Sequence, residues 1–119
     1  MANDPRLVVR FYQSSAGKEP VRDWLSDVKQ ITLEDKKTIG IDIKTVQYGW
    51  PMGMPMVRKL ESNLWEIRST IPSGIARVLF TIQGNCIVLL HGFVKKSQKT
   101  PLADLDLARN RLKQIRGEK

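Results

Sequence analysis

The stretch from Lys59 to Pro101, KLESNLWEIRSTIPSGIARVLFTIQGNCIVLLHGFVKKSQKTP, decides the fold. Its apolar segments have a period near two, and short links rich in Gly, Pro, Ser and Asn separate them. Links this short join antiparallel neighbours, so the stretch predicts an antiparallel sheet. The expected strands cover residues 57–60, 64–69, 75–81 and 87–94.

The residues before this stretch predict one more strand and two helices. The β-rich run LVVRFY at 7–12 is followed by a Ser-Ser-Ala-Gly turn, which is typical of a strand end. Pro20 suits the first position of a helix whose apolar side chains recur at helical spacing as far as Val28. Thr32 begins a capping-box pattern, and apolar steps of four, three and four then indicate a second, longer helix. The run GWPMGMPM at 49–56 is expected to be a loop.

The C-terminal residues predict a last amphipathic helix. Thr100 and Pro101 have the types of an N-cap and a first-turn residue, and Gly117 is a typical helix end. Acidic residues lie early and basic residues late, as the helix dipole favours. The expected order is β-α-α-β-β-β-β-α. We therefore predict one small α+β domain over residues 1–119, with its helices packed on one face of a twisted, mostly antiparallel sheet.

Positive charge is concentrated in the second half of the chain. The 119 residues contain 20 Lys and Arg against 12 Asp and Glu, a formal net charge of +8. Residues 1–56 hold 8 basic and 7 acidic side chains, whereas residues 57–119 hold 12 and 5. This imbalance favours an acidic partner such as nucleic acid, which would meet the second half first. The alternative is a solvated basic surface without a charged ligand.

Composition also predicts the compartment and the absence of a cofactor. The single cysteine, Cys86, lies in an apolar run and cannot form an internal disulfide, which favours the reducing cytoplasm. The N-terminal MANDPRLVV lacks the apolar region of a signal peptide, and no apolar run is long enough for a membrane span. One histidine, one cysteine and no close pair of carboxylates in the basic half make a metal site improbable. We expect no cofactor and no membrane association.

Strand alternation places several cations on one face of the expected sheet. In LWEIR, Glu66 and Arg68 share the face opposite to the tryptophan, and in IARVLF Arg77 alternates with apolar neighbours. Arg68 and Arg77 are therefore expected on an open face. The last strand ends in Lys95, and Lys96, Gln98 and Lys99 follow it, so the cations would converge on one concave surface.

His91 is the natural candidate for acid or base chemistry, because it is the only histidine and its unperturbed pKa lies near neutrality. A partly buried histidine with a satisfied hydrogen bond is the alternative. For Arg68, a structural ion pair with Glu61 or Glu66 is an equal alternative to a catalytic role. Phe93 is a candidate for stacking on an RNA base, although a core position is the default for a strand phenylalanine. The three tryptophans are expected in the core.

The motifs KLESNLWEIR, IARVLF and IVLLHGFVKKSQKTP resemble the RelE/HigB superfamily of toxins from bacterial type II toxin–antitoxin modules, in particular its phage-derived HigB-like branch. The resemblance covers nearly the whole chain, and its most specific part is HGFVKKSQKTP. It implies a ribosome-dependent endoribonuclease that cuts messenger RNA without a metal. It also implies a helix-turn-helix antitoxin as partner, with operator DNA bound only through that antitoxin.

The resemblance assigns site residues one by one. Arg77 matches a phosphate-binding arginine, Arg68 matches a basic position on the preceding strand, and Glu66 falls where some relatives carry a lysine. Such a cluster would stabilise the phosphorane formed when a ribose 2′-hydroxyl attacks the adjacent phosphate. The predicted catalytic residues are Arg77, Arg68, Lys96 and His91, and the predicted RNA-binding residues are Lys59, Lys95, Lys99, Gln98 and Phe93.

One departure from the family pattern and one shared architecture keep other functions open. The C-terminal tyrosine of some family members has no counterpart, because the only tyrosines are Tyr12 and Tyr48. The general base is therefore open. ParE-like toxins share this architecture but inhibit DNA gyrase without cutting RNA, and fold does not separate the two activities. A nucleic-acid adaptor without activity is a third alternative.

Overall fold

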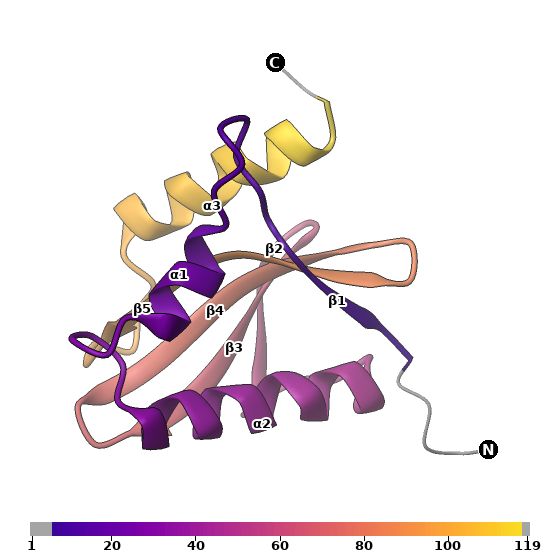
Figure 1. Cartoon of the computed structure of the whole chain (residues 1–119). Helices are drawn as coiled ribbons and strands as arrows, with labels where there is room; N and C mark the ends of the chain where they lie inside the picture. The colour runs from indigo at the N-terminus through magenta and orange to yellow at the C-terminus, as the bar shows by residue number, and fades with distance from the viewer. Residues whose placement is uncertain (1–5, 118–119) are drawn as a thin grey trace.

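A five-stranded sheet forms the centre of the protein, with helices packed against it (Figure 1). The structure is a computed structural model that describes residues 6–117. The predicted order β-α-α-β-β-β-β-α is confirmed. The elements are β1 (Val8–Phe11), α1 (Pro20–Ser26), α2 (Leu33–Gly49), β2 (Val57–Glu61), β3 (Leu64–Ile71), β4 (Gly74–Gln83), β5 (Cys86–Lys95) and α3 (Leu102–Ile115).

The strands lie in the order β1-β5-β4-β3-β2. The neighbours among β2, β3, β4 and β5 are antiparallel, as the short turns predict. β1 adds to the sheet in parallel beside β5, so that Val8 pairs with Cys86 and Phe11 with Leu89. The first five residues of the N-terminal MANDPRLVV lie outside the described residues.

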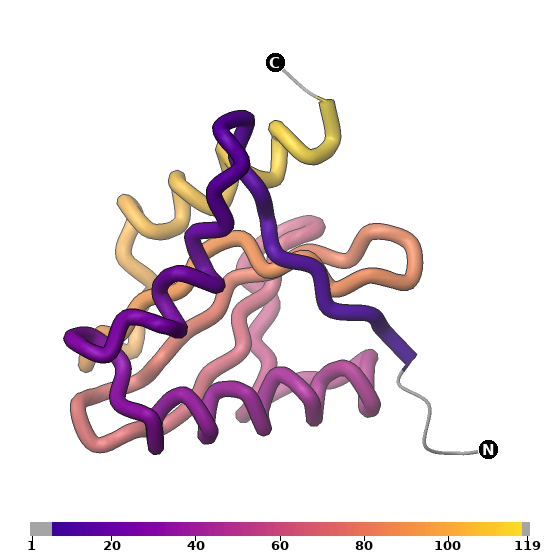
Figure 2. Tube along the Cα trace, in the orientation of Figure 1, coloured from indigo at the N-terminus to yellow at the C-terminus, as the bar shows by residue number. Residues whose placement is uncertain are grey.

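Helices cover both faces of the sheet, so the expectation that they pack on one face was wrong (Figure 2). α1 and α2 pack on the face that carries Val78 and Phe80, whereas α3 packs on the opposite face against Leu79. The physical reason is visible in β4, whose central residues are buried on both sides. A strand that is apolar on both faces needs a cover on each.

α2 begins as its sequence predicts and packs through one stripe. The Thr32 hydroxyl accepts a hydrogen bond of 3.0 Å from the Asp35 backbone N–H, which satisfies one of the free donors at the helix start. Ile39, Ile43 and Val46 are all buried against the sheet. None of the helices within residues 6–117 is long and apolar enough to cross a membrane.

α1 reaches the sheet through a glycine in β5. A Cβ atom built on Gly92 would lie 2.3 Å from the Trp24 ring, so only glycine lets this indole lie against the strand. Trp24, Trp50 and Trp65 all pack against the main core, as predicted. Trp50 makes edge contacts with Trp65 at 5.1 Å and with Phe80 at 5.6 Å between ring centroids.

α3 is attached to the sheet by two arginines. Arg109 pairs with Glu61 at the end of β2 at 2.7 Å, and these hydrogen bonds raise its pKa. Arg111 donates a hydrogen bond of 2.8 Å to the carbonyl of Leu90, where the pairing of β4 with β5 slips by one residue. Such a bulge frees a carbonyl from the ladder and leaves it for a side-chain donor. Both contacts hold α3 over the face that carries the candidate site.

Candidate functional site

Strand register places three arginines together on the face that α3 covers. Arg68 of β3 lies directly opposite Arg77 of β4, and Arg58 of β2 lies opposite Glu66 of β3. Directly paired side chains on neighbouring strands are about 5 Å apart at their Cβ atoms. We call Arg58, Arg68 and Arg77 the arginine cluster. Three guanidinium groups thus surround one buried carboxylate.

Arg77 is fully buried, with a relative exposure of 0%. None of its three guanidinium nitrogens has a hydrogen-bond partner among the described residues. Its guanidinium carbon lies 5.8 Å from the centroid of the Phe93 ring. Burial lowers the pKa of Arg77, and the positive charges of Arg68 and Arg58 act in the same direction while Glu66 opposes them. The expectation of an open face was wrong, because α3 and the segment before it cover this arginine.

Glu66 holds two parts of the site together. Its Oε1 accepts a hydrogen bond of 2.7 Å from Arg68, and its Oε2 accepts one of 2.7 Å from the Thr100 hydroxyl. The prediction of Thr100 as a helix N-cap was wrong: Pro101 occupies that position, and the Thr100 side chain is drawn to the buried carboxylate. Of the alternatives for Arg68, the structure contains the ion pair with Glu66. The catalytic role of Arg68 stays a prediction.

The segment from Lys96 to Pro101, which we call the strap, runs between β5 and α3 and lies against the arginine cluster. The backbone carbonyl of Gln98 accepts long hydrogen bonds of 3.4 Å from both Arg58 and Arg68. The side-chain oxygen of Gln98 accepts a further one of 2.9 Å from Arg68. Oxygen atoms of the protein itself therefore occupy donors that would otherwise be available to an anion.

The predicted lysines fall into two groups. Lys95, Lys96 and Lys99 are exposed at the end of β5 and in the strap, beside the arginine cluster. Lys59 lies apart from them: its ammonium nitrogen is 5.9 Å from the Trp65 ring, on the face that α2 covers. β2 alternation instead directs Arg58 toward the cluster. Sequence alternation contains the signal for Arg58, but it has to be combined with the register of β2 against β3.

His91 and Phe93 lie next to one another beneath α3. The His91 Nε2 atom is 2.7 Å from Asp104 Oδ1, and the two rings stack with centroids 5.3 Å apart. Burial lowers the pKa of His91, although the hydrogen bond to Asp104 opposes this effect. The neutral ring then carries its proton on Nε2 and donates it to Asp104. Phe93 is buried against Arg77, and its role in stacking on RNA stays a prediction.

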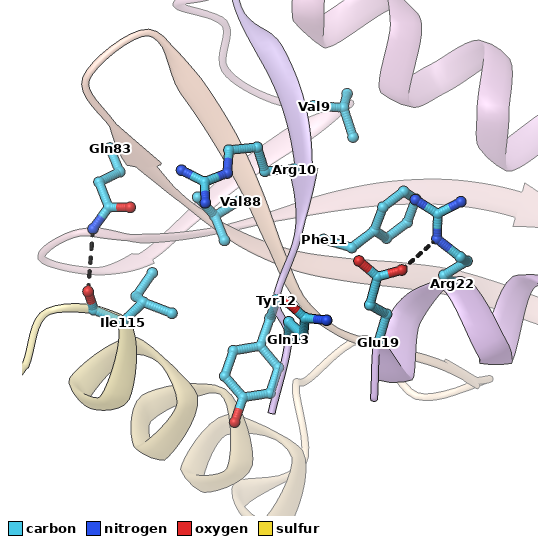
Figure 3. Close-up of a pocket in the computed structure, with 10 residues that line it drawn as sticks. All are labelled: Val9, Arg10, Phe11, Tyr12, Gln13, Glu19, Arg22, Gln83, Val88 and Ile115. Carbon is cyan, nitrogen blue, oxygen red and sulfur yellow. Dashed lines mark hydrogen bonds and ion pairs between the residues drawn. The ribbon is translucent and has the colours of Figure 1, made fainter. Parts of the chain in front are cut away.

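A separate hollow of about 500 Å³ lies between β1, α1 and α3 (Figure 3). It contains none of the residues predicted from the sequence. Arg22 is paired there with Glu19 at 2.6 Å and stacks over Phe11 at 4.5 Å. Its polar lining is thus largely engaged in local contacts. We place the candidate site at the arginine cluster, where a buried cation has no hydrogen-bond partner within residues 6–117.

The described part of the chain contains no group of three His, Cys, Asp or Glu side chains arranged to hold a metal ion. The groups that the arginine cluster itself brings together are fixed positive charges, with His91 as a nearby group able to accept a proton. Sequence reasoning also missed Asp104, the hydrogen-bond partner of His91. Nothing in the linear sequence indicates that the first turn of α3 comes to lie over His91.

Comparison with known proteins gives the family of the chain. No curated protein matches the chain significantly. Residues 23–113 match the family described as phage-derived protein Gp49-like (DUF891), a toxin-like family of toxin–antitoxin systems. The match runs from α1 to near the end of α3 and includes every residue of the arginine cluster and the strap. Because it covers most of the sequence, the chain belongs to the Gp49-like family of phage-derived proteins.

Proposed function

We propose that this protein is the toxin of a type II toxin–antitoxin module and that it cuts messenger RNA on the ribosome. Membership of the Gp49-like family supports the toxin part of the proposal. The concentration of positive charge in residues 57–119 supports a polyanionic substrate. Arg77 carries the proposal, because a buried guanidinium without a hydrogen-bond partner lowers stability, and such unsatisfied groups are typical of functional sites.

A phosphate group fits the needs of this cluster. A guanidinium can donate two parallel hydrogen bonds to phosphate oxygens, and three of them converge here. The Gln98 carbonyl already accepts from Arg58 and Arg68, as a phosphate oxygen would. RNA would replace it once the strap moves away from the sheet. Lys95 at the end of β5 and Lys96 and Lys99 in the strap are exposed and would meet the RNA backbone on either side of the cut.

The reaction needs no group beyond those of the chain and the RNA. The ribose 2′-oxygen forms a bond to phosphorus while the bond from phosphorus to the 5′-oxygen breaks, which leaves a cyclic phosphate and a 5′-hydroxyl. In this proposal, neutral His91 accepts the 2′-hydroxyl proton and Asp104 orients its ring, while Lys96 is the donor to the leaving oxygen. The arginine cluster stabilises the charge of the phosphorane between these steps.

The partners follow from the same proposal. A small helix-turn-helix antitoxin would neutralise the protein and bind operator DNA, and the ribosome would present the messenger strand. The protein would act in the cytoplasm. A short reading frame for a helix-turn-helix protein, found beside the reading frame of this chain, would be the simplest observation in favour of this proposal.

Primer extension tests the activity directly. We expect new stops on a defined message only when the protein and ribosomes are both present. Arg77→Ala should abolish the stops and restore growth of cells that express the protein. Arg10→Ala is the matched control, since it removes the same charge from an exposed site on β1 outside the arginine cluster. Intact message together with blocked DNA supercoiling would contradict the proposal and indicate a gyrase inhibitor instead.

A further inference from the structure

A second hollow, of about 480 Å³, opens beside Arg68. This volume lies within the range of small-ligand sites. Its lining brings together Arg68 and Gln98 from the cluster and strap, Met54 and Met56 from the loop before β2, and Asp42 from α2. A cation, an amide, a carboxylate and apolar side chains thus face one space.

The hollow exists because β3 is longer than its neighbour β2. Pairing between the two strands begins at Val57 and Ile67, so residues 68–71 of β3 have no partner in β2. The loop crosses at this point, and the Arg68 backbone N–H donates a hydrogen bond of 2.9 Å to the Met56 carbonyl. Met54 remains 66% exposed beside this crossing.

Asp42 is held in one orientation inside this hollow. The Ser69 hydroxyl donates a hydrogen bond of 2.6 Å to its Oδ2 atom. Its other oxygen, Oδ1, has no hydrogen-bond partner among residues 6–117. The side-chain oxygen of Gln98 accepts from Arg68, whereas its Nε2 donors are likewise unused within the described residues. The hollow therefore offers a fixed anionic acceptor and a neutral donor.

We infer that this hollow binds one base of a single-stranded RNA, with a preference for guanine, beside the phosphates held by the arginine cluster. Guanine alone presents two adjacent donors, N1–H and the N2 amino group, to a carboxylate, and its O6 accepts from a donor such as the Gln98 amide. Adenine and cytosine place a ring acceptor next to their amino group, and uracil has a single donor between two acceptors. Bases of unpaired RNA are commonly recognised on these edges.

Met54 and Met56 supply the contact with the flat face of the base. A thioether is polarisable and adapts to the face of an aromatic ring. Exposed Met54 beside the Asp42 carboxylate can therefore contact the face of a base while the carboxylate binds its edge. The inference rests on the proposed function in taking RNA as the ligand, but it concerns binding rather than cutting.

The test is binding of short single-stranded RNA in the absence of ribosomes. Fluorescence anisotropy would compare oligouridine hexamers that carry one central guanosine, adenosine or cytidine. We expect the wild type to bind the guanosine hexamer on the order of tenfold more tightly than the others. Asp42→Asn should lose this preference, because the carboxylate that accepts from the N1–H and N2 amino groups of guanine is replaced by an amide, which carries a donor of its own. Met54→Ala should weaken binding of all hexamers equally without changing the preference.

Asp23→Asn is the matched control, since it removes the same charge from an exposed site on α1 and should leave the preference intact. Equal binding of all hexamers by the wild type, no binding at all, or a preference that survives Asp42→Asn would each overturn the inference. Thermal melting of each variant identifies loss of fold. If Asp42→Asn does not fold, unchanged binding of the hexamers by folded Met54→Ala would overturn the inference. Messenger cleavage is measured separately, so guanosine preference without cleavage would refute the proposed function alone.

Discussion

Arg77 carries a positive charge into the protein interior without a hydrogen-bond partner among the described residues. Burying a charge without a hydrogen-bond partner costs free energy, and replacing even a whole buried ion pair by apolar side chains of similar volume is often neutral or stabilising, by about 1–4 kcal/mol. We expect Arg77→Met to keep or raise the free energy of unfolding in urea and to abolish toxicity. Glu66 would keep Arg68 and Thr100 as partners. A loss of several kcal/mol would show instead that Arg77 anchors the fold.

His91 should make stability depend on pH. Its pKa in the folded protein lies below the ordinary value of 6.5, so the unfolded chain binds the proton more readily. The free energy of unfolding is therefore expected to be level above pH 6.5 and to fall as the pH drops from 6.5 toward the folded pKa. Urea unfolding in a series of buffers from about pH 5 to about pH 8 measures this dependence of the free energy of unfolding on pH. His91→Gln should remove this part of the dependence, and an unchanged profile would contradict it.

Single residues also show what alternation can and cannot predict. The shared face of Arg68 and Arg77 was predictable, because it follows from a period of two and a short turn. Their burial was not, since nothing local indicates that α3 and the strap cover this face. Thr100 illustrates the cause: its sequence context suits a helix cap, but a buried carboxylate distant in the chain competes for the hydroxyl.

Among the elements, β5 and α2 contain glycines with opposite roles in packing. An added methyl at Gly92 would meet the Trp24 ring at 2.3 Å, whereas nothing lies within 4 Å of a methyl at Gly40. We expect Gly92→Ala to lower the free energy of unfolding by about 1–3 kcal/mol through overpacking between β5 and α1. Gly40→Ala, in the exposed middle of α2, should raise it by about 0.5–1 kcal/mol. Urea unfolding of both variants gives the comparison.

The strap is held in part by one side chain. Thr100→Val would leave an oxygen of the buried Glu66 without its donor, at a cost of about 1–3 kcal/mol. We expect faster amide hydrogen exchange in residues 96–99, while exchange in α2 stays unchanged. Thr45→Val is the matched control, because its hydroxyl donates to the Ile41 carbonyl on an exposed helix surface. Unaltered exchange in the strap would mean that other contacts hold it.

Element order could be predicted, whereas the placement of elements around the sheet could not. Periodicity and turn residues locate the strands to within a few positions, because these signals are local. The bulge at Leu90 has no such signal. It turns His91 toward the α3 face together with Leu90, and so brings the histidine to Asp104. The position of α3 on the second face likewise has no local signal, because tertiary packing alone decides which face the helix covers.

For the whole molecule, the uneven charge predicts how the proposed binding of RNA responds to salt. Each phosphate contact of a single strand contributes about 0.7 to the slope of log affinity against log salt. Replacing Lys95, Lys96 and Lys99 by glutamine should therefore reduce the slope by up to about 2. The same replacement of Lys29, Lys36 and Lys37 in the first half should leave it nearly unchanged. Equal effects of the two triple variants on RNA binding would contradict a directed basic surface.

β1 pairs with β5, although the two strands are far apart in the sequence: Val8 lies beside Cys86. During synthesis, the N-terminal strand must therefore wait for β5 to emerge before it can join the sheet. The same late strand leads into the strap and α3, which complete and cover the arginine cluster. A nascent chain cannot assemble this cluster early, because β5, the strap and α3 must all have left the ribosome before the cluster is complete and covered.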